Sequence, residues 1–278
     1  MSTCLPGVAQ CSDSMLTLAT TLCSSVARPG LLRVWRPAAR HLMAAASDAS
    51  VFKEIEGFQN IKWPEDFPFQ DERYFKRVDE SPDSAFYEEP RFVTHIDDEA
   101  IKSLTEYYAH VMSPGADVLD ICSSWISHLP DGLTLGRVAG LGMNEAELSR
   151  NKRLTEWVAQ DLNVDPTLPY EDNSFDFVCN VVSVDYLTKP MAIFEEMHRV
   201  LKPGGTALMS FSNRCFPTKA IAMWTGSDDA AHIWIVGSYY KFSALEKGGW
   251  ADTKAVDISA AGGGRGDPMW VVQGSKPK

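Results

Sequence analysis

The stretch that most constrains the fold is a short apolar run, Ala116–Ile121, followed by a turn of small residues. A run of this kind is typical of a buried strand in a parallel sheet. In α/β sheets, ligands bind beside the turns that follow such strands. Here the turn carries Cys122, Ser123 and Ser124, although close approach of a ligand to the backbone usually requires glycine. The stretch therefore predicts a ligand site of altered shape; a turn that no longer binds a ligand is the alternative.

Strands and helices are expected to alternate along the rest of the chain. Further strands are predicted at 137–141, 155–158, 175–182, 206–211, 255–258 and 269–273. Helices are predicted at 97–112, 122–136, 145–150, 190–201 and 216–224. Asp97 or Asp98 is expected to cap the first of them, and Asn144 the helix at 145–150. This alternation favours a doubly wound, mostly parallel, seven-stranded α/β sheet. Because no helix is expected between the last two strands, they are predicted to form an antiparallel hairpin at one edge.

The first fifty residues differ in composition from the rest. They contain four arginines, no lysine and two acidic residues, and they are rich in Ser, Thr and Ala. This composition is typical of an organelle transit peptide. We expect residues 1–46 to be such a peptide, with Met43–Ala46 as a processing region; a disordered tail is the alternative. The expected destination is the chloroplast, with the mitochondrion as the alternative.

Charge and the length of apolar runs exclude several functions. Without residues 1–46 the chain keeps 22 basic and 36 acidic residues, a net charge of −14, which repels nucleic acids and anionic lipids. No apolar run reaches the roughly 18 residues of a membrane span. No C-x-x-C pair or His/Cys cluster predicts a metal site. The charge does not exclude a small anionic substrate bound by a local arginine.

Residues 47–96 combine aromatic side chains with prolines. The prolines at 64, 68, 82 and 90 exclude a long helix, and the aromatic side chains predict packing against the remaining chain. We interpret this segment as an N-terminal arm or lid over a domain that spans residues 97–278.

Two motifs carry a resemblance to a known family. They are LPYEDNSFDFV at 168–178 and FEEMHRVLKPGG at 194–205, and Val118–Asp120 and DPMWVV at 267–272 add to them. The combination resembles the class I S-adenosylmethionine-dependent methyltransferases that act on small molecules. The chain also resembles a narrower plant, algal and bacterial subgroup of this family. This resemblance rests on PRFVTHID at 90–97, on the D-x-C-S-S-W turn at 120–125 and on SFSNR at 210–214.

The resemblance implies a Rossmann-like fold and S-adenosylmethionine as cofactor. The positions that match the cofactor motifs are Asp120, Ile121, Cys122, Ser123, Ser124, Gly142, Met143, Asn144, Asp161, Leu162, Asn163 and Ser183. Gly142 stands where the family carries an acid for the ribose hydroxyls, so a main contact is absent; a packing role is the alternative for this glycine. Asp161 is expected to accept from the adenine amine or to cap a turn.

Polar residues at the predicted strand ends and in the arm are the candidates for catalysis. They are His95, Arg91, Asp185, Tyr186, Asn213 and Arg214. Methyl transfer depends mainly on alignment, and a base is needed only where the acceptor must lose a proton. Arg91 and Arg214 together suggest an anionic acceptor. The sequence favours a methyltransferase and leaves open a non-catalytic relative with a role in assembly or regulation.

Overall fold

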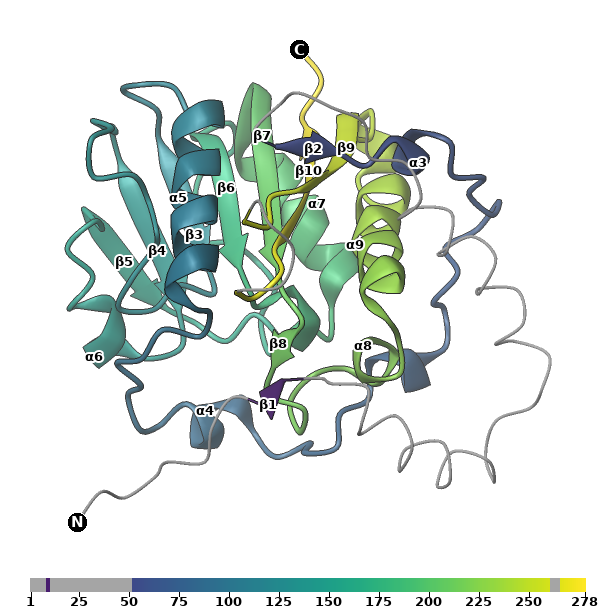
Figure 1. Ribbon diagram of the computed structural model, residues 1–278, viewed down its shortest axis with the longest axis horizontal. Coiled ribbons are helices and arrows are strands. Elements are labelled where there is room, and N and C mark those ends of the chain that lie inside the picture. Colours follow the sequence, from purple (N-terminus) through teal and green to yellow (C-terminus); the bar gives the residue numbers. More distant parts are fainter. Residues whose placement is uncertain (1–8, 11–51, 261–265) are drawn as a thin grey trace.

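The computed structural model describes residues 9–10, 52–260 and 266–278 (Figure 1). Apart from β1 (Ala9–Gln10), the predicted transit peptide lies outside these residues. β1 pairs with β8 (Arg214–Cys215) in an antiparallel two-stranded sheet. None of the described helices is long and apolar enough to cross a membrane.

An eight-stranded sheet forms the centre of the molecule, in the order β2-β9-β10-β7-β6-β3-β4-β5. Its parallel strands are β3 (Val118–Ile121), β4 (Val138–Gly142), β5 (Glu156–Ala159), β6 (Phe175–Val181) and β7 (Leu201–Phe211). β10 (Trp270–Ser275) is antiparallel to both β7 and β9 (Ala251–Asp257). The predicted α/β sheet with its antiparallel hairpin is confirmed. An eighth strand, β2 (Lys53–Glu54), pairs with β9 at the outer edge.

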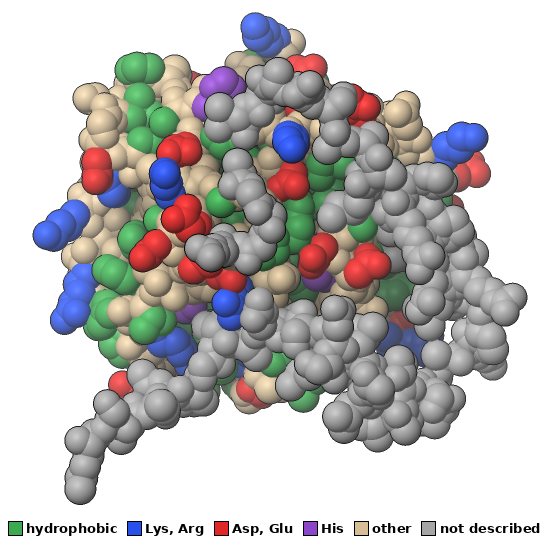
Figure 2. Space-filling model, in the orientation of Figure 1, with side chains coloured by type: hydrophobic (Ala, Val, Ile, Leu, Met, Phe, Trp, Pro, Cys, Tyr) green, Lys and Arg blue, Asp and Glu red, His purple; other side chains and the backbone are tan. Residues whose placement is uncertain are grey.

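Helices cover both faces of this sheet (Figure 1). α5 (Asp98–Val111) packs on one face, in one apolar core, and α7 (Pro190–Val200) and α9 (Asp229–Phe242) pack on the other, in a second core. Acidic side chains gather on the face that carries α5 (Figure 2), and this helix exposes Asp98, Glu99 and Glu106. The shorter helices are α3 (Glu56–Gln59), α4 (Asp83–Phe86), α6 (Glu145–Leu148), α8 (Ala222–Thr225), η1 (Glu72–Phe75), η2 (Val184–Tyr186) and η3 (Leu245–Lys247).

The starts of two helices follow their capping residues. The Asp97 side chain accepts from the Ala100 amide at 2.9 Å, so α5 begins where its acid predicts. The Asn144 side chain accepts from the Ala146 and Glu147 amides, at 2.9 and 3.1 Å, and caps α6 as predicted.

Three sequence predictions about local structure are wrong. Residues 122–136 form turns and bends instead of a helix, because Pro130 interrupts them and His128 adopts a left-handed φ of 52°. The helix expected at 216–224 is reduced to α8, Ala222–Thr225. β7 begins at Leu201, beside Phe175, and not at residue 206.

The long helix α9 was not predicted at all. Every residue from Ala230 to Tyr240 is buried, so the sequence lacks the alternation of apolar and polar positions that marks a surface helix. One face of α9 supports the arm: Trp63 stacks on Trp234, with ring centroids 5.3 Å apart. Gly237 lets Phe58 approach, because a Cβ at this position would lie 2.6 Å from the Phe58 ring. The arm is thereby fixed to the domain.

Candidate functional site

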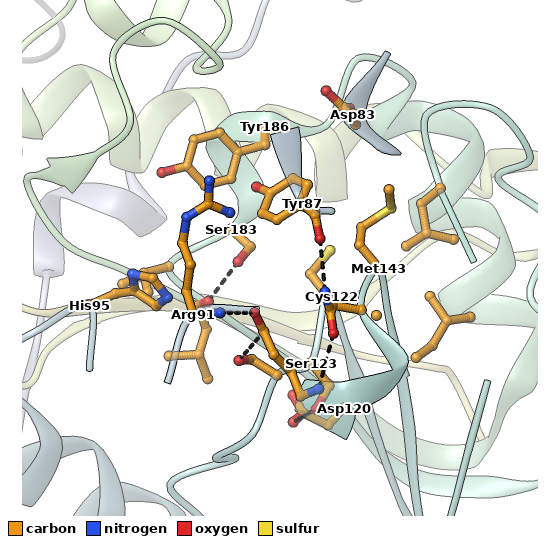
Figure 3. A pocket seen from close by; sticks show the side chains of 18 of the residues that line it. Asp83, Tyr87, Arg91, His95, Asp120, Cys122, Ser123, Met143, Ser183 and Tyr186 are labelled. Atoms are coloured by element: carbon orange, nitrogen blue, oxygen red, sulfur yellow. Dashed lines mark hydrogen bonds between the residues drawn. The ribbon is translucent and has the colours of Figure 1, made fainter. Parts of the chain in front are cut away.

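A pocket lies at the carboxyl ends of β3, β4, β6 and β7, beside the loop that follows β5 (Figure 3). We call the part of its lining contributed by residues 120–124, 141–144, 160–163 and 181–183 the floor. We call the part contributed by the arm the roof; its lining residues are Asp83, Tyr87, Arg91 and His95. Chain segments far apart in sequence therefore meet at one edge of the sheet, as parallel strand ends must.

Most of the predicted site residues line this pocket. The exceptions are Ile121 and Asp185, buried beside it with 0% and 1% exposure, and Asn213, which also lies outside the lining. The lining also contains side chains that were not predicted as site residues: Asp83, Tyr87, His128, Glu147 and Phe216. Trp125 is an anchor outside the pocket, since its indole nitrogen donates to the Val93 carbonyl at 3.0 Å.

The turn after β3 holds itself together. Cys122 has a left-handed φ of 56°, a conformation that glycine adopts more easily. The Ser123 hydroxyl donates to the Asp120 carboxylate at 2.7 Å, and the Ser123 amide donates to the Leu141 carbonyl at 2.8 Å. Burial raises the pKa of Asp120 to about 6 and that of Cys122 to about 12. The thiol is therefore protonated at neutral pH and a poor nucleophile.

Gly142 has a packing role in this turn. A Cβ at position 142 would lie 2.1 Å from the carbonyl oxygen of Ser123. The space that a side chain would need is taken by the turn, so this turn and an acid at position 142 exclude each other. The absence of glycine from the turn after β3 and the absence of an acid at position 142 therefore belong to one packing arrangement.

A different carboxylate reaches the pocket from the following helix. Glu147 is 8% exposed, and its two oxygens accept from the Arg91 amide and from the Ser124 hydroxyl, each at 2.6 Å. The sequence predicts that this residue lies in the first turn of a helix, but it does not predict the direction of its side chain. Glu147 joins the floor to the roof.

Two residues matched to cofactor motifs also make these connections. Asn163 donates to Asp83 at 2.9 Å and accepts from the Thr188 amide at 2.8 Å. Asn144 donates to the Tyr87 carbonyl at 2.9 Å, in addition to capping α6. Asp161 caps its own turn, accepting from the Asn163 amide at 2.8 Å. The polar groups of the floor are therefore largely satisfied by the protein itself.

Asp83 is the main attachment point of the roof. Its two oxygens lie 2.6 and 2.7 Å from Nη1 of Arg77, and Lys219 lies 3.2 Å away. The side chains of Asp83, Arg77 and Lys219 are only 7%, 8% and 1% exposed. Burial alone raises the pKa of Asp83, but the hydrogen bonds from Arg77 and Asn163 hold it below its ordinary value.

Other polar groups of the roof have fewer partners. Arg91 donates through Nη2 to the Phe86 carbonyl at 2.7 Å, whereas its buried Nη1 has no hydrogen-bond partner. His95 lies beside Phe216, with ring centroids 5.6 Å apart, and its buried Nδ1 also has no partner. Burial lowers the pKa of His95, so its ring is neutral at neutral pH.

The strand ends after β6 and β7 complete the pocket. Val182 has a φ of 42°, a strained conformation for a β-branched residue. The Tyr186 hydroxyl accepts from the Phe216 amide at 2.8 Å, and the Ser183 hydroxyl donates to a backbone carbonyl at 2.9 Å. Arg214 is paired with Asp267 at 2.7 Å, so its charge is compensated within the protein.

Residues 123–209 match a family model described as a methyltransferase domain. This segment is methyltransferase-like. It contains the floor of the pocket from Ser123 onward, the loop after β5 and strands β4 to β6.

Curated relatives of this chain are methyltransferases, and the similarity covers part of their length. A demethylmenaquinone methyltransferase of Staphylococcus epidermidis is 35% identical over 108 residues, which cover 34% of this chain and 45% of that protein. One of Bacillus cereus is 33% identical over 107 residues, with 35% and 45% covered. The chain therefore matches less than half the length of these relatives.

Among solved structures, a SAM-dependent methyltransferase from Aquifex aeolicus is similar with a TM-score of 0.44 and 16% identity. The similarity covers 70% of this chain and 97% of that one.

Proposed function

We propose that this protein is an S-adenosylmethionine-dependent methyltransferase that acts on a small molecule in the chloroplast, with the mitochondrion as the alternative compartment. One observation carries the proposal. The turn after β3, the residues after β4 and the loop after β5 converge on a single pocket within a methyltransferase-like segment. In open α/β sheets this edge is where nucleotide-like ligands bind. The proposal includes membership of the plant, algal and bacterial subgroup that carries the D-x-C-S-S-W turn.

The residues present fit the cofactor, with an altered set of polar contacts. Ser123 and Ser124 are small, and their hydroxyl oxygens, which donate to Asp120 and Glu147, are still able to accept hydrogen bonds from the ammonium group of the methionine part. Met143 and Leu162 provide apolar contacts for the adenine, and Asp161 lies in the same lining. The cofactor supplies a methyl group on a positively charged sulfur; the protein supplies alignment.

The acceptor is expected on the side of the pocket formed by the roof and the ends of β6 and β7. Arg91, His95, Tyr186 and Arg214 line this side. Because His95 is neutral, it is able to accept a proton from an acceptor hydroxyl. Asp185 and Asn213 stand behind the lining and act, in this proposal, by supporting it.

Calorimetric titration with S-adenosylmethionine and with its demethylated product tests the proposal. Both ligands are expected to bind the wild type, and Met143→Trp, which fills the pocket, is expected to weaken binding at least about tenfold. Val164→Trp is the matched control, because Val164 is 73% exposed and outside the lining. Absence of heat at millimolar ligand would contradict the proposal.

A second candidate is a non-catalytic protein of this fold with a role in assembly or regulation. It is favoured by the packing of Gly142 against Ser123 and by the internal pairing of Asn144 and Asn163. The same titration separates the two functions, since a non-catalytic relative that has lost its cofactor gives no binding.

A further inference from the structure

One wall of the pocket carries three buried nitrogen atoms without a hydrogen-bond partner. They are Nη1 of Arg91, Nδ1 of His95 and Nδ1 of His128. Arg91 and His95 come from the roof, whereas His128 comes from the irregular segment between β3 and β4. Buried nitrogens without a partner also occur elsewhere in the described residues, for example Nδ1 of His198 and Nδ1 of His232. The three named above lie together in one pocket, and this grouping requires an explanation.

Arg91 differs from the other arginines near the pocket. Arg77 is paired with Asp83, and Arg214 with Asp267, whereas no ion pair forms between Arg91 and any carboxylate of the described residues. Its guanidinium carbon lies 4.4 Å from the centre of the Phe86 ring and 5.7 Å from that of Phe216. Arg91 thus brings to the pocket a positive charge that forms no ion pair, although the carboxylates of Glu147 and Asp161 line the same pocket.

The two histidines do not add to this charge. Burial lowers the pKa of His95 and lowers that of His128 to about 4, so both rings are neutral at neutral pH. A neutral imidazole is able to donate one hydrogen bond and accept another. The wall therefore offers one cation and two neutral imidazoles, a combination suited to a single anionic group.

The carboxylates of the pocket already have donors. Asp83 is bound by Arg77, Glu147 by Ser124, and Asp120 by Ser123. None of them needs the Arg91 guanidinium for its own hydrogen bonding. The three nitrogens therefore have no partner among these carboxylates.

Aromatic side chains surround the same wall. Tyr87 and Phe216 line the pocket beside Arg91, and Tyr186 lies 6.1 Å from Phe216 between ring centroids. In Figure 3 the Arg91 side chain extends between His95 and Tyr87. Rings pack well against the faces and edges of other rings, so this surface favours a planar, aromatic ligand.

We infer that the wall formed by Arg91, His95 and His128 binds an oxygen anion, a carboxylate or a phenolate, on an aromatic methyl acceptor. The inference rests on the proposed function, because it names the class of acceptor for that site. The guanidinium donates through Nη1, and the neutral imidazoles donate to the remaining lone pairs of the anion.

Calorimetric titrations with benzoate and with benzamide test the inference. The two probes have nearly the same shape, but only benzoate is charged. We expect benzoate to bind at least about tenfold more tightly than benzamide, and Arg91→Gln to remove this preference. Arg91→Lys keeps the charge and should retain part of it. Arg150→Gln is the matched control, since Arg150 also lies over a ring, 3.8 Å from Phe92, but outside the pocket lining.

The cofactor is the other possible source of an anion, because its methionine part carries a carboxylate. Titration of the same variants with the demethylated cofactor separates the two sources. Our inference requires that Arg91→Gln weaken benzoate and leave cofactor affinity unchanged. It is overturned if the substitution weakens the cofactor alone, if benzoate and benzamide bind equally, or if benzoate does not bind. Benzoate binding that depends on Arg91, in a protein that does not bind the cofactor, supports the anion site and refutes the proposed methyltransferase function.

Discussion

The floor and the roof of the pocket satisfy their polar groups in different ways. On the floor, Asp120, Asn144 and Asn163 bind hydroxyls, amides and carbonyls of the protein itself. On the roof, Arg91 and His95 keep buried nitrogens without partners. A group bound within the protein stabilises the fold, whereas a buried group without a protein partner costs stability. The polar groups of the floor therefore stabilise the fold, whereas Arg91 and His95 of the roof are the groups that we expect to recognise a ligand.

The largest effect is expected where the roof is attached to the floor. Asp83→Asn removes the buried carboxylate that Arg77 and Lys219 share. It leaves Arg77 only the more exposed Glu80 and Lys219 only the more exposed Asp79, so we expect the free energy of unfolding to fall by about 3 kcal/mol. Urea denaturation measures this change. Asp71→Asn is the control, because Asp71 also binds an arginine of the arm but at an exposed position, so its loss should be much smaller than that of Asp83. Equal losses of stability in the two variants would show that Asp83 does not attach the roof to the floor more strongly than an exposed ion pair would.

A pH-dependent effect is expected from the floor. Because the folded-state pKa of Asp120 is about 6 and its unfolded-state value is about 4, the folded protein holds the proton between these pH values. Raising the pH through this window therefore lowers stability, by about 2–3 kcal/mol in total. We expect Asp120→Asn to lack this loss, so its stability relative to wild type should rise from pH 4 to pH 7 by that amount. Parallel pH profiles of denaturation for the two proteins would contradict the assignment.

A smaller loss is expected from disturbing the turn against which Gly142 packs. Gly142→Ala places a methyl group 2.1 Å from the Ser123 carbonyl oxygen, and the turn must move at a cost of about 2 kcal/mol. The matched control is Gly132→Ala, since a Cβ there meets no atom within 4 Å. Thermal and chemical denaturation of both variants measure the difference. If Gly142→Ala is tolerated as well as the control, the floor is less rigid than its hydrogen bonds indicate.

The smallest change in stability is expected for Arg91→Met. The substitution removes the hydrogen bond to Phe86, but it also removes an unpartnered buried nitrogen, so we expect a change within about 1 kcal/mol. Chemical denaturation is again the measurement. A loss above about 2 kcal/mol would show that Arg91 holds the fold, and the distinction between floor and roof would fail for this residue.

Much of the sheet was predictable because its strands are short apolar runs between turn signals. The caps Asp97 and Asn144 also gave the starts of two helices, since a capping side chain acts on its own next turn. Helix α9 was missed because burial on all sides removes the periodic pattern. The prediction of a helix at 122–136 was wrong. The segment is long enough for a helix, but its length does not reveal that His128 adopts a left-handed backbone conformation.

The site was predictable to the extent that parallel strand ends meet. This rule placed Ser123, Gly142 and Asp161 in one lining. What lay beyond the sequence were contacts between distant segments. The hydrogen bond from Asn163 to Asp83 joins residues 80 positions apart in the sequence. The clash between a side chain at position 142 and the Ser123 carbonyl depends on a distance that only the folded structure gives.

The irregular segment between β3 and β4 has a consequence for the electric field in the pocket. A helix that begins after the first strand would point its N-terminal amides, and about half a positive charge, at a ligand. Between Ile121 and Val138, all of which the structure describes, no helix begins. The positive potential for an anion must then come from a side chain, and Arg91 supplies it. Unlike a helix dipole, a guanidinium can be lost or moved by a single substitution, so selectivity for anions is a property that this fold is able to change without rebuilding its backbone.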